Sequence, residues 1–230
     1  PFDCRITPNY NLLSKKEEKE WVEIMIKESI KNGKGTEEEI RNHIWNKLLN
    51  NRDNLQKGFD VNRYKSQDKH YGIYCLSRVW DSILMWSHYA NFHQGFVVGF
   101  NYEKLSKYDH NLNIGDIVYD LNFPEINPME HYRSDIDMAN AMIKEVFTKH
   151  KDWVYEKEIR LFKTIFPSEF SEKDRIVNYP DYFIEEMTIG CASSKKTKEE
   201  LIEIGRQKGI NKIYLAKKTP FKFGLDRILV

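Results

Sequence analysis

The chain has 230 residues, of which 40% are hydrophobic and 31% are charged. This is enough apolar material for one large core or two small ones. The 36 Lys and Arg residues balance 35 Asp and Glu residues, and the net charge of +1 excludes a globally basic surface for nucleic acid or an anionic membrane. No apolar run approaches the length of a membrane span and no signal peptide is visible, so we expect a soluble protein with no membrane partner.

The three cysteines, Cys4, Cys75 and Cys191, are odd in number and far apart, and none lies in a CxxC motif. This usage predicts small buried side chains in a reducing compartment and argues against a disulfide framework or a zinc site. We therefore expect a cytoplasmic protein. The chain starts at Pro1 without a methionine, and we expect a further segment upstream.

The first part of the chain, about residues 14–52, reads as a helical insertion. Ser14 is placed to cap one helix, and Thr36 with Glu39 forms a capping box for a second, each followed by apolar residues at helical spacing. The simplest interpretation is a solvated helical hairpin that covers a sheet edge or offers a partner surface. Asn54–His70 is polar and is predicted to be a loop.

A central stretch, Tyr71–Phe100, contains strand, helix and strand in succession. Tyr71–Ser77 and Phe96–Phe100 are rich in aromatic and β-branched residues, and Asp81 is placed to cap the helix between them. The apolar residues of this helix fall on nearly every face, which predicts burial on more than one side. Ser87 and His88 on the helix would then need buried partners.

The second half of the chain alternates irregularly between strands and helices. The pattern predicts strands at Asp116–Leu121, Glu156–Phe166, Tyr182–Gly190, Lys212–Ala216 and Lys222–Leu229, and helices at Asp135–Lys149 and Thr197–Lys208. This order favours an α+β fold over a doubly wound sheet. We expect one domain over residues 1–230, with a mixed central sheet and inserted helices.

The segment YEKEIR offers the first candidate site. On a strand, Glu156, Glu158 and Arg160 would face the same side and form a row. Two close carboxylates raise one pKa and a neighbouring arginine lowers it again, so the row could orient a ribose hydroxyl or stabilise a developing cation. The simpler alternative is an ion-paired, solvent-facing edge strand, which is the commoner meaning of such a spacing.

The helix segment Trp86-Ser87-His88-Tyr89 offers the second candidate site. Adjacent residues point about 100° apart on a helix, so Ser87 and His88 are no catalytic dyad. His88 could bind a ligand while Trp86 or Tyr89 stacks on a planar ring, and a hydrogen-bonded core histidine is the alternative. His88 and His93 lack the HExxH setting and nearby ligands of a zinc site, so no metal is expected.

The third candidate is the segment IGCASSKK, residues 189–196. A glycine after a strand and serines before a helix suit a phosphate, but GxGxxG and P-loop patterns are absent. Capping of the following helix by Ser194 or Thr197 is the preferred interpretation.

The run YCLSRVWDSILMWSHYANFHQGFVVGF resembles the signature of the bacterial domain-of-unknown-function family 2971. PFDCRI, WVYEKEIRLF and FIEEMTIGCASSKKTKEELIEI are similar to three further segments of that family, so the resemblance covers nearly the whole chain. Leu76 stands where the family usually has phenylalanine, and the strand that precedes PFD in the family would lie upstream of Pro1.

The closing order of glutamate, strand, helix and strand resembles the C-terminal half of ADP-ribosyltransferases. The resemblance implies that Glu158, or alternatively Glu156, holds the nicotinamide ribose of NAD and assists glycosidic cleavage. It also implies that Arg160 braces that carboxylate and that the Trp86–Tyr89 helix walls the pocket. The histidine or arginine that such enzymes carry on their first strand would lie upstream of Pro1.

The sequence thus gives two functional hypotheses. The first is an NAD-binding ADP-ribosyltransferase-like protein, acting as a transferase on a protein or nucleic-acid acceptor or as an NAD glycohydrolase, in a bacterial toxin or phage-defence setting. The second is a non-catalytic interaction module that binds a protein partner through helices 14–52. An enzyme requires Glu158 and the 86–89 helix to converge on an open pocket, whereas a module would bury both.

Overall fold

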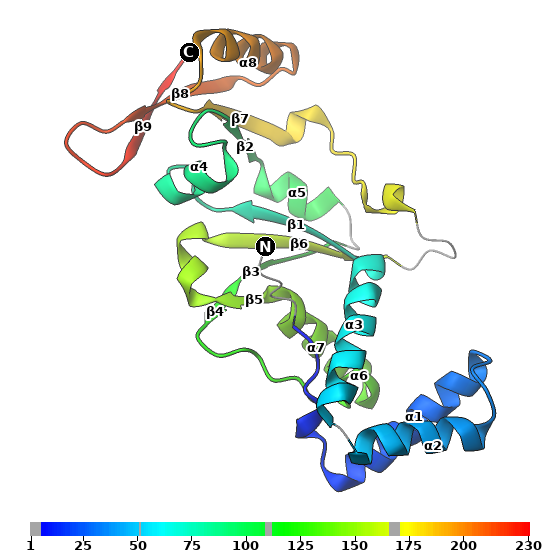
Figure 1. Ribbon diagram of the computed structural model, residues 1–230. Coiled ribbons are helices and arrows are strands. Elements are labelled where there is room, and N and C mark those ends of the chain that lie inside the picture. The colour runs from blue at the N-terminus through cyan, green and yellow to red at the C-terminus, as the bar shows by residue number, and fades with distance from the viewer. Residues whose placement is uncertain (1–5, 51, 109–111, 166–170) are drawn as a thin grey trace. The chain divides into compact units, whose positions relative to one another are not determined.

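The computed structural model describes residues 6–50, 52–108, 112–165 and 171–230. The chain divides into two compact units (Figure 1). Unit 1 comprises Pro1–Tyr71 and Val118–Lys151, and unit 2 comprises Gly72–Ile117 and Asp152–Val230. The expectation of a single domain over residues 1–230 stays a prediction.

The mixture of helices and strands confirms the expected α+β class, but the expectation of a single mixed central sheet is wrong. Among the described residues, the strands lie in three sheets, with the orders β1-β6-β3, β2-β7-β8-β9 and β4-β5. The reason is that the two strands of the central stretch, Tyr71–Phe100, belong to different sheets. Its first strand, β1 (Tyr71–Ser77), pairs with β6, whereas its second strand, β2 (Phe96–Phe100), pairs with β7.

Unit 1 is mainly helical. Its elements are η1 (Tyr10–Leu12), α1 (Lys15–Lys31), α2 (Glu37–Asn50), α3 (Arg52–His70), β4 (Val118–Asp120), α6 (Glu130–Arg133), α7 (Asp135–Phe147) and β5 (Thr148–His150). The two helices expected over 14–52 are present as α1 and α2, and Ser14 forms a reciprocal capping box with Glu17. Thr36 and Glu39 exchange the same pair of bonds before α2.

The predicted loop at Asn54–His70 is wrong, because these residues form most of α3. The inward face of this helix is largely polar, so the apolar periodicity that marks a helix is missing. Phe59 stacks on Tyr10 with ring centroids 4.7 Å apart. One and two turns further on, Arg63 and Gln67 donate to the buried Glu145 carboxylate of α7.

Unit 2 contains the other sheets. Besides β1 and β2, its elements are α4 (Ile83–Tyr89), α5 (Tyr102–Tyr108), β3 (Asn113–Asp116), η2 (Lys151–Glu156), β6 (Glu158–Thr164), η3 (Glu172–Arg175), η4 (Asp181–Phe183), β7 (Ile184–Ile189), α8 (Lys195–Gln207), β8 (Lys212–Lys218) and β9 (Leu225–Leu229). β7 and β8 are parallel and α8 connects them, whereas β2 and β9 run antiparallel to their neighbours. Figure 1 shows α8 lying along this sheet.

Gly190, just after β7, occupies a close approach between two backbones. Its N–H donates to the Gly95 carbonyl at 2.8 Å, and the next turn returns a bond from Ala192 N–H to the His93 carbonyl. A Cβ at this position would lie 2.1 Å from the His93 carbonyl oxygen. The glycine therefore joins the end of β7 to the turn after α4.

The expectation for the cysteines is also corrected. Cys75 is exposed and Cys191 is half-buried, so neither is the fully buried side chain that was expected, and Cys4 lies outside the described residues. In the part of the chain that the structure describes, no helix is both long and apolar enough to span a bilayer.

Candidate functional site

The helix α4 carries four of the sequence-predicted residues. Ser82, not Asp81, caps it by accepting a bond from the Met85 N–H. Trp86 is only 1% exposed, and its indole N–H donates to the Trp80 carbonyl at 2.6 Å. Trp86 is therefore a core residue in this structure, and its ring is not presented for stacking on a ligand.

The opposite side of α4 faces solvent, so the expectation of burial on several sides is wrong. Tyr89 is 62% exposed, and His88 is also exposed and so has no need of a buried partner. The helix has only seven residues and ends at Tyr89, so one apolar stripe is enough to anchor it. That stripe packs Trp86 and Ala90 against Ala216 and Leu225.

Ser87 contacts a histidine, though not the adjacent one. Its Oγ lies 3.1 Å from His93 Nε2 and donates to the Ile83 carbonyl at 2.9 Å. Because the hydroxyl proton is directed to that carbonyl, the serine is not set up as a nucleophile.

The turn after α4 is strained. Asn91, Phe92 and His93 have φ values of 46°, 52° and 64°, three consecutive left-handed residues, none of which is a glycine. This conformation costs roughly 1–2 kcal/mol per residue. Strain of this kind concentrates at functional sites and persists where the surrounding structure enforces it. The sequence does not indicate this turn, because none of the three residues is a glycine and only Asn91 is of a type that readily adopts the conformation.

The two glutamates of YEKEIR are both buried, at 3% for Glu156 and 4% for Glu158. They do not form the expected row on one strand, because Glu156 ends η2 and only Glu158 lies in β6. Lys157 between them has φ 42°, which interrupts the extended backbone. Arg160 Nε donates to Glu158 Oε1 at 2.6 Å, so the predicted pairing of that carboxylate with Arg160 is present.

The structure brings the first two candidate segments together. The Tyr89 hydroxyl donates to Glu156 Oε1 at 2.8 Å, across 67 positions of sequence. One end of this contact is an exposed ring on α4, and the other is a buried carboxylate next to Glu158. An exposed aromatic side chain thus contacts one of the two buried carboxylates, that of Glu156.

Strand β1 adds two residues that sequence reasoning did not single out. Ser77 Oγ donates to the Glu156 carbonyl at 2.6 Å and so fixes the backbone before β6. Desolvation and the neighbouring Glu158 carboxylate raise the pKa of the Cys75 thiol to about 11, although the residue as a whole is exposed. The raised pKa keeps the thiol protonated even in mildly alkaline solution, so its proton stays available to donate to Glu158.

The third segment, IGCASSKK, follows its preferred interpretation. Ser194 Oγ accepts from the Thr197 N–H and caps α8, and Gly190 makes the close backbone approach described above. Among the residues that the structure describes, no group of three or more His, Cys, Asp or Glu side chains is arranged to hold a metal ion.

Comparison with known proteins adds one finding. A family model described as "Protein of unknown function (DUF2971)" matches residues 85–161. No curated protein and no solved structure matches the chain. The matched range is shorter than the resemblance expected from the sequence, but it includes Trp86–Tyr89, Glu156, Glu158 and Arg160. The family expectation is confirmed, since residues 85–161, from α4 into β6, match DUF2971.

Proposed function

We propose that this chain is an NAD-binding protein of ADP-ribosyltransferase-like fold, whose site is formed by Tyr89, Glu156, Glu158 and Arg160. One observation carries the proposal. The Tyr89–Glu156 hydrogen bond joins the α4 motif to the acidic pair at the start of β6, within the segment that matches the family. The strained turn after α4 is a second feature of a functional site in the same segment.

Each residue has a distinct role in this proposal. Glu158 accepts a hydrogen bond from a hydroxyl of the nicotinamide ribose, and Arg160, 2.6 Å away, fixes the orientation of that carboxylate. Because Glu156 and Glu158 are only 3% and 4% exposed, the proposal requires an opening step. In this step the exposed Tyr89 side chain releases Glu156, uncovers the carboxylates and stacks on the nicotinamide. Trp86 keeps α4 in place from the core, and Ser87 and His88 line the helix beside the ligand.

The reaction is cleavage of the bond between the ribose C1′ and the nicotinamide nitrogen. The bonding electron pair leaves with the nitrogen, which neutralises the pyridinium, and C1′ becomes an oxocarbenium ion. A carboxylate held close to that cation stabilises the transition state in a water-poor site. Attack by water gives ADP-ribose and a proton, which is the glycohydrolase reaction, whereas attack by a protein or nucleic-acid nucleophile gives the transferase reaction. A bacterial toxin or phage-defence effector is the setting we propose.

The test is nicotinamide release from NAD, measured by chromatography. We expect release by the intact chain and a loss of at least tenfold in Glu158→Gln, which keeps the shape and removes the charge. Glu103→Gln is the matched control, because Glu103 is an exposed residue of α5 whose side chain is 83% accessible. Equal rates in the chain and in Glu158→Gln would refute the proposed role of this carboxylate.

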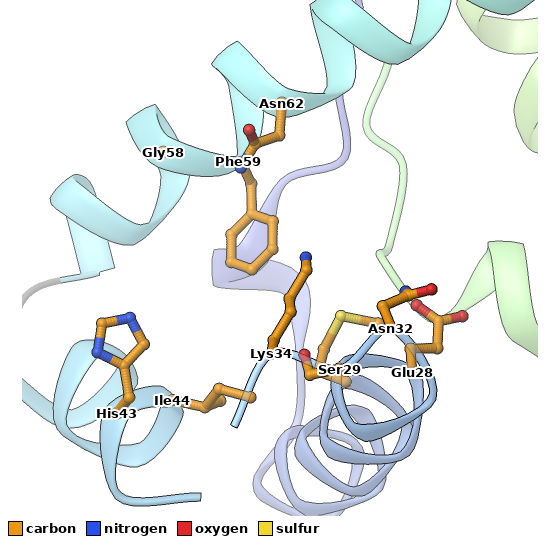
Figure 2. Close-up of a pocket in the computed structure, with 10 residues that line it drawn as sticks. Glu28, Ser29, Asn32, Lys34, His43, Ile44, Gly58, Phe59 and Asn62 are labelled. Carbon is orange, nitrogen blue, oxygen red and sulfur yellow. The ribbon is translucent and has the colours of Figure 1, made fainter. Parts of the chain in front are cut away.

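The second candidate is a non-catalytic interaction module, and one cavity in unit 1 favours it. A cavity of about 320 Å³ lies between the helical hairpin and α3. Figure 2 shows Phe59 of α3 pointing down between Lys34 and His43, with Ile44 below. The lining combines the apolar Met25, Ile44 and Phe59 with polar residues that include both Glu28 and Lys34, and this combination fits a partner segment that inserts an apolar anchor.

Selection of peptides from a displayed library would test this candidate. We expect sequences with a large apolar anchor residue to be enriched on the chain and lost on Phe59→Ala. Enrichment that is the same on both proteins would show that this cavity is not the binding surface.

A further inference from the structure

A second cavity, in unit 2, lies at the carboxyl ends of the two parallel strands. It has a volume of about 450 Å³ and is lined by residues that follow β7 or end β8, with one residue each from α8 and β9: Cys191, Ala192, Lys198, Leu215, Ala216, Lys217, Lys218 and Ile228. In α/β units, ligands bind in the crevice outside the carboxyl ends of the strands. A volume of this size falls in the range of small-molecule sites.

The charge of this cavity has one sign. Three of its lining residues are lysines, and none is acidic. Within the part of the chain that the structure describes, no ion pair or hydrogen bond is formed by the ammonium groups of Lys198, Lys217 and Lys218. The neighbouring acids do not neutralise them, because Glu199 and Glu200 lie nearest to Lys195 and Lys196, at 3.9 and 3.8 Å.

The pairing of β8 with β9 also leaves the ammonium groups of Lys217 and Lys218 available to bind an anion. Lys217 lies opposite Asp226 in the β8–β9 register, yet the two side chains form no ion pair in this described part of the molecule. Lys218 lies opposite Leu225. Because Lys217 and Lys218 are consecutive residues of β8, their side chains leave opposite faces of the sheet and flank the cavity from two sides, where an anion of two or more charges would be attracted to both.

The remaining wall of the cavity is apolar. Leu215, Ala216 and Ile228 are aliphatic, and Ala216 belongs to the core cluster that also contains Trp86 of α4. A ligand that suits both parts carries a compact multiple negative charge next to a flat, weakly polar group. A nucleoside diphosphate has this combination.

We propose that this cavity binds the diphosphate group of a small nucleotide, with Lys198, Lys217 and Lys218 as its ligands. A nucleic acid fits less well, because its backbone needs a basic stripe, and the chain as a whole has a net charge of only +1. The inference does not rest on the proposed NAD chemistry, since neither Glu156 nor Glu158 lines this cavity.

Calorimetric titration with ADP, AMP and adenosine tests the proposal. We expect affinity to decrease in that order and the binding of ADP to weaken with added NaCl. The double substitution Lys217→Gln/Lys218→Gln should weaken ADP binding by about tenfold or more. The control Lys107→Gln/Lys212→Gln removes the same charge from α5 and from the opposite end of β8, and should leave the affinity unchanged.

Four results would overturn the proposal. The first is that ADP gives no heat although the chain is folded, and the second is that adenosine binds as tightly as ADP. The third is an unchanged ADP affinity in Lys217→Gln/Lys218→Gln. The fourth is that a short single-stranded oligonucleotide binds more tightly than ADP through the same lysines. The variant Glu158→Gln separates this site from the proposed active site. It should bind ADP like the unmodified chain, so a failure of the NAD proposal and a failure of this one are distinguishable.

Discussion

Each unit contains a buried glutamate site, and the two sites differ in where their partners come from. In unit 1, the Glu145 side chain is 1% exposed and contacts Arg63 and Gln67 of α3, the Tyr71 hydroxyl and His131 of α6. In unit 2, Glu156 accepts a hydrogen bond from the hydroxyl of the exposed Tyr89, and Glu158 accepts one from Arg160 of the same strand.

The difference separates a structural carboxylate from a functional one. Glu145 ties α3, α6 and α7 together, and its network is drawn from both inside and outside the matched segment, since Glu145 and His131 lie within residues 85–161 whereas Arg63, Gln67 and Tyr71 do not. Glu156 instead accepts a hydrogen bond from the solvent-exposed Tyr89, at the end of a helix that runs directly into the strained turn at 91–93. The network of Glu145 should therefore determine stability, and the pair at β6 should determine ligand binding.

The largest expected effect comes from removing the structural carboxylate. Glu145→Ala leaves the half-buried Arg63 without its counter-charge, which costs about 3–5 kcal/mol of unfolding free energy. Urea unfolding followed by circular dichroism measures this loss, and Glu103→Ala serves as the exposed control. A loss below about 1 kcal/mol would contradict the structural role of the network.

The same network predicts a pH dependence. Desolvation by burial raises the pKa of Glu145, but His131 and Arg63 outweigh it and hold the pKa below the ordinary value of 4.5. A carboxylate with a lowered folded-state pKa stabilises the fold above its unfolded pKa, and that contribution disappears as the pH falls through the folded value. Stability should therefore decrease from about pH 4.5 downward, and Glu145→Gln should flatten this part of the profile. An identical profile in the variant would assign the loss to other groups.

A smaller effect is expected at the join between β7 and the turn after α4. Gly190→Ala forces a Cβ against the carbonyls of His93 and Gly95 and should cost about 1–3 kcal/mol or more, because the three nearest atoms all belong to backbone. Thermal unfolding measures this loss of stability. The control Gly58→Ala, where a Cβ would meet nothing within 4 Å, should not destabilise the chain. If Gly190→Ala and Gly58→Ala change the unfolding temperature equally, the close approach at Gly190 does not affect the stability.

The smallest effect concerns a helix cap. Ser14→Ala removes one half of the capping box of α1, and typical losses for such caps are about 1 kcal/mol. Because α1 belongs to unit 1, the change should not alter any NAD-dependent heat. A change in ligand binding without a change in stability would contradict the separation of roles drawn here.

Local signals in the sequence predicted most of the elements. Capping residues located α1 and α2, and β-branched runs located β1, β2, β7 and β8. The prediction failed where burial was polar, as in α3, whose inward Arg63 and Gln67 look like surface residues in the sequence. It also failed for the burial of α4, because the exposed Tyr89 has the same character as the buried Trp86.

The candidate site was predicted in part. Glu156, Glu158 and Tyr89 stood out as residue types that suit a site, but only the folded chain places the Tyr89 hydroxyl on Glu156. The left-handed turn at 91–93 and the break at Lys157 are long-range consequences of packing, which a single sequence does not encode locally. Cys75 and Ser77 were missed because their partners lie about 80 positions away.

The measurement that tests the central claim most directly is calorimetric titration of NAD into the chain and into Tyr89→Phe and Glu158→Gln. The account predicts saturable heat from the intact chain and at least tenfold weaker binding in Glu158→Gln. Tyr89→Phe keeps the ring and should retain most of the affinity. The account is contradicted if a correctly folded chain gives no heat, or if Glu158→Gln binds NAD as tightly as the unmodified chain.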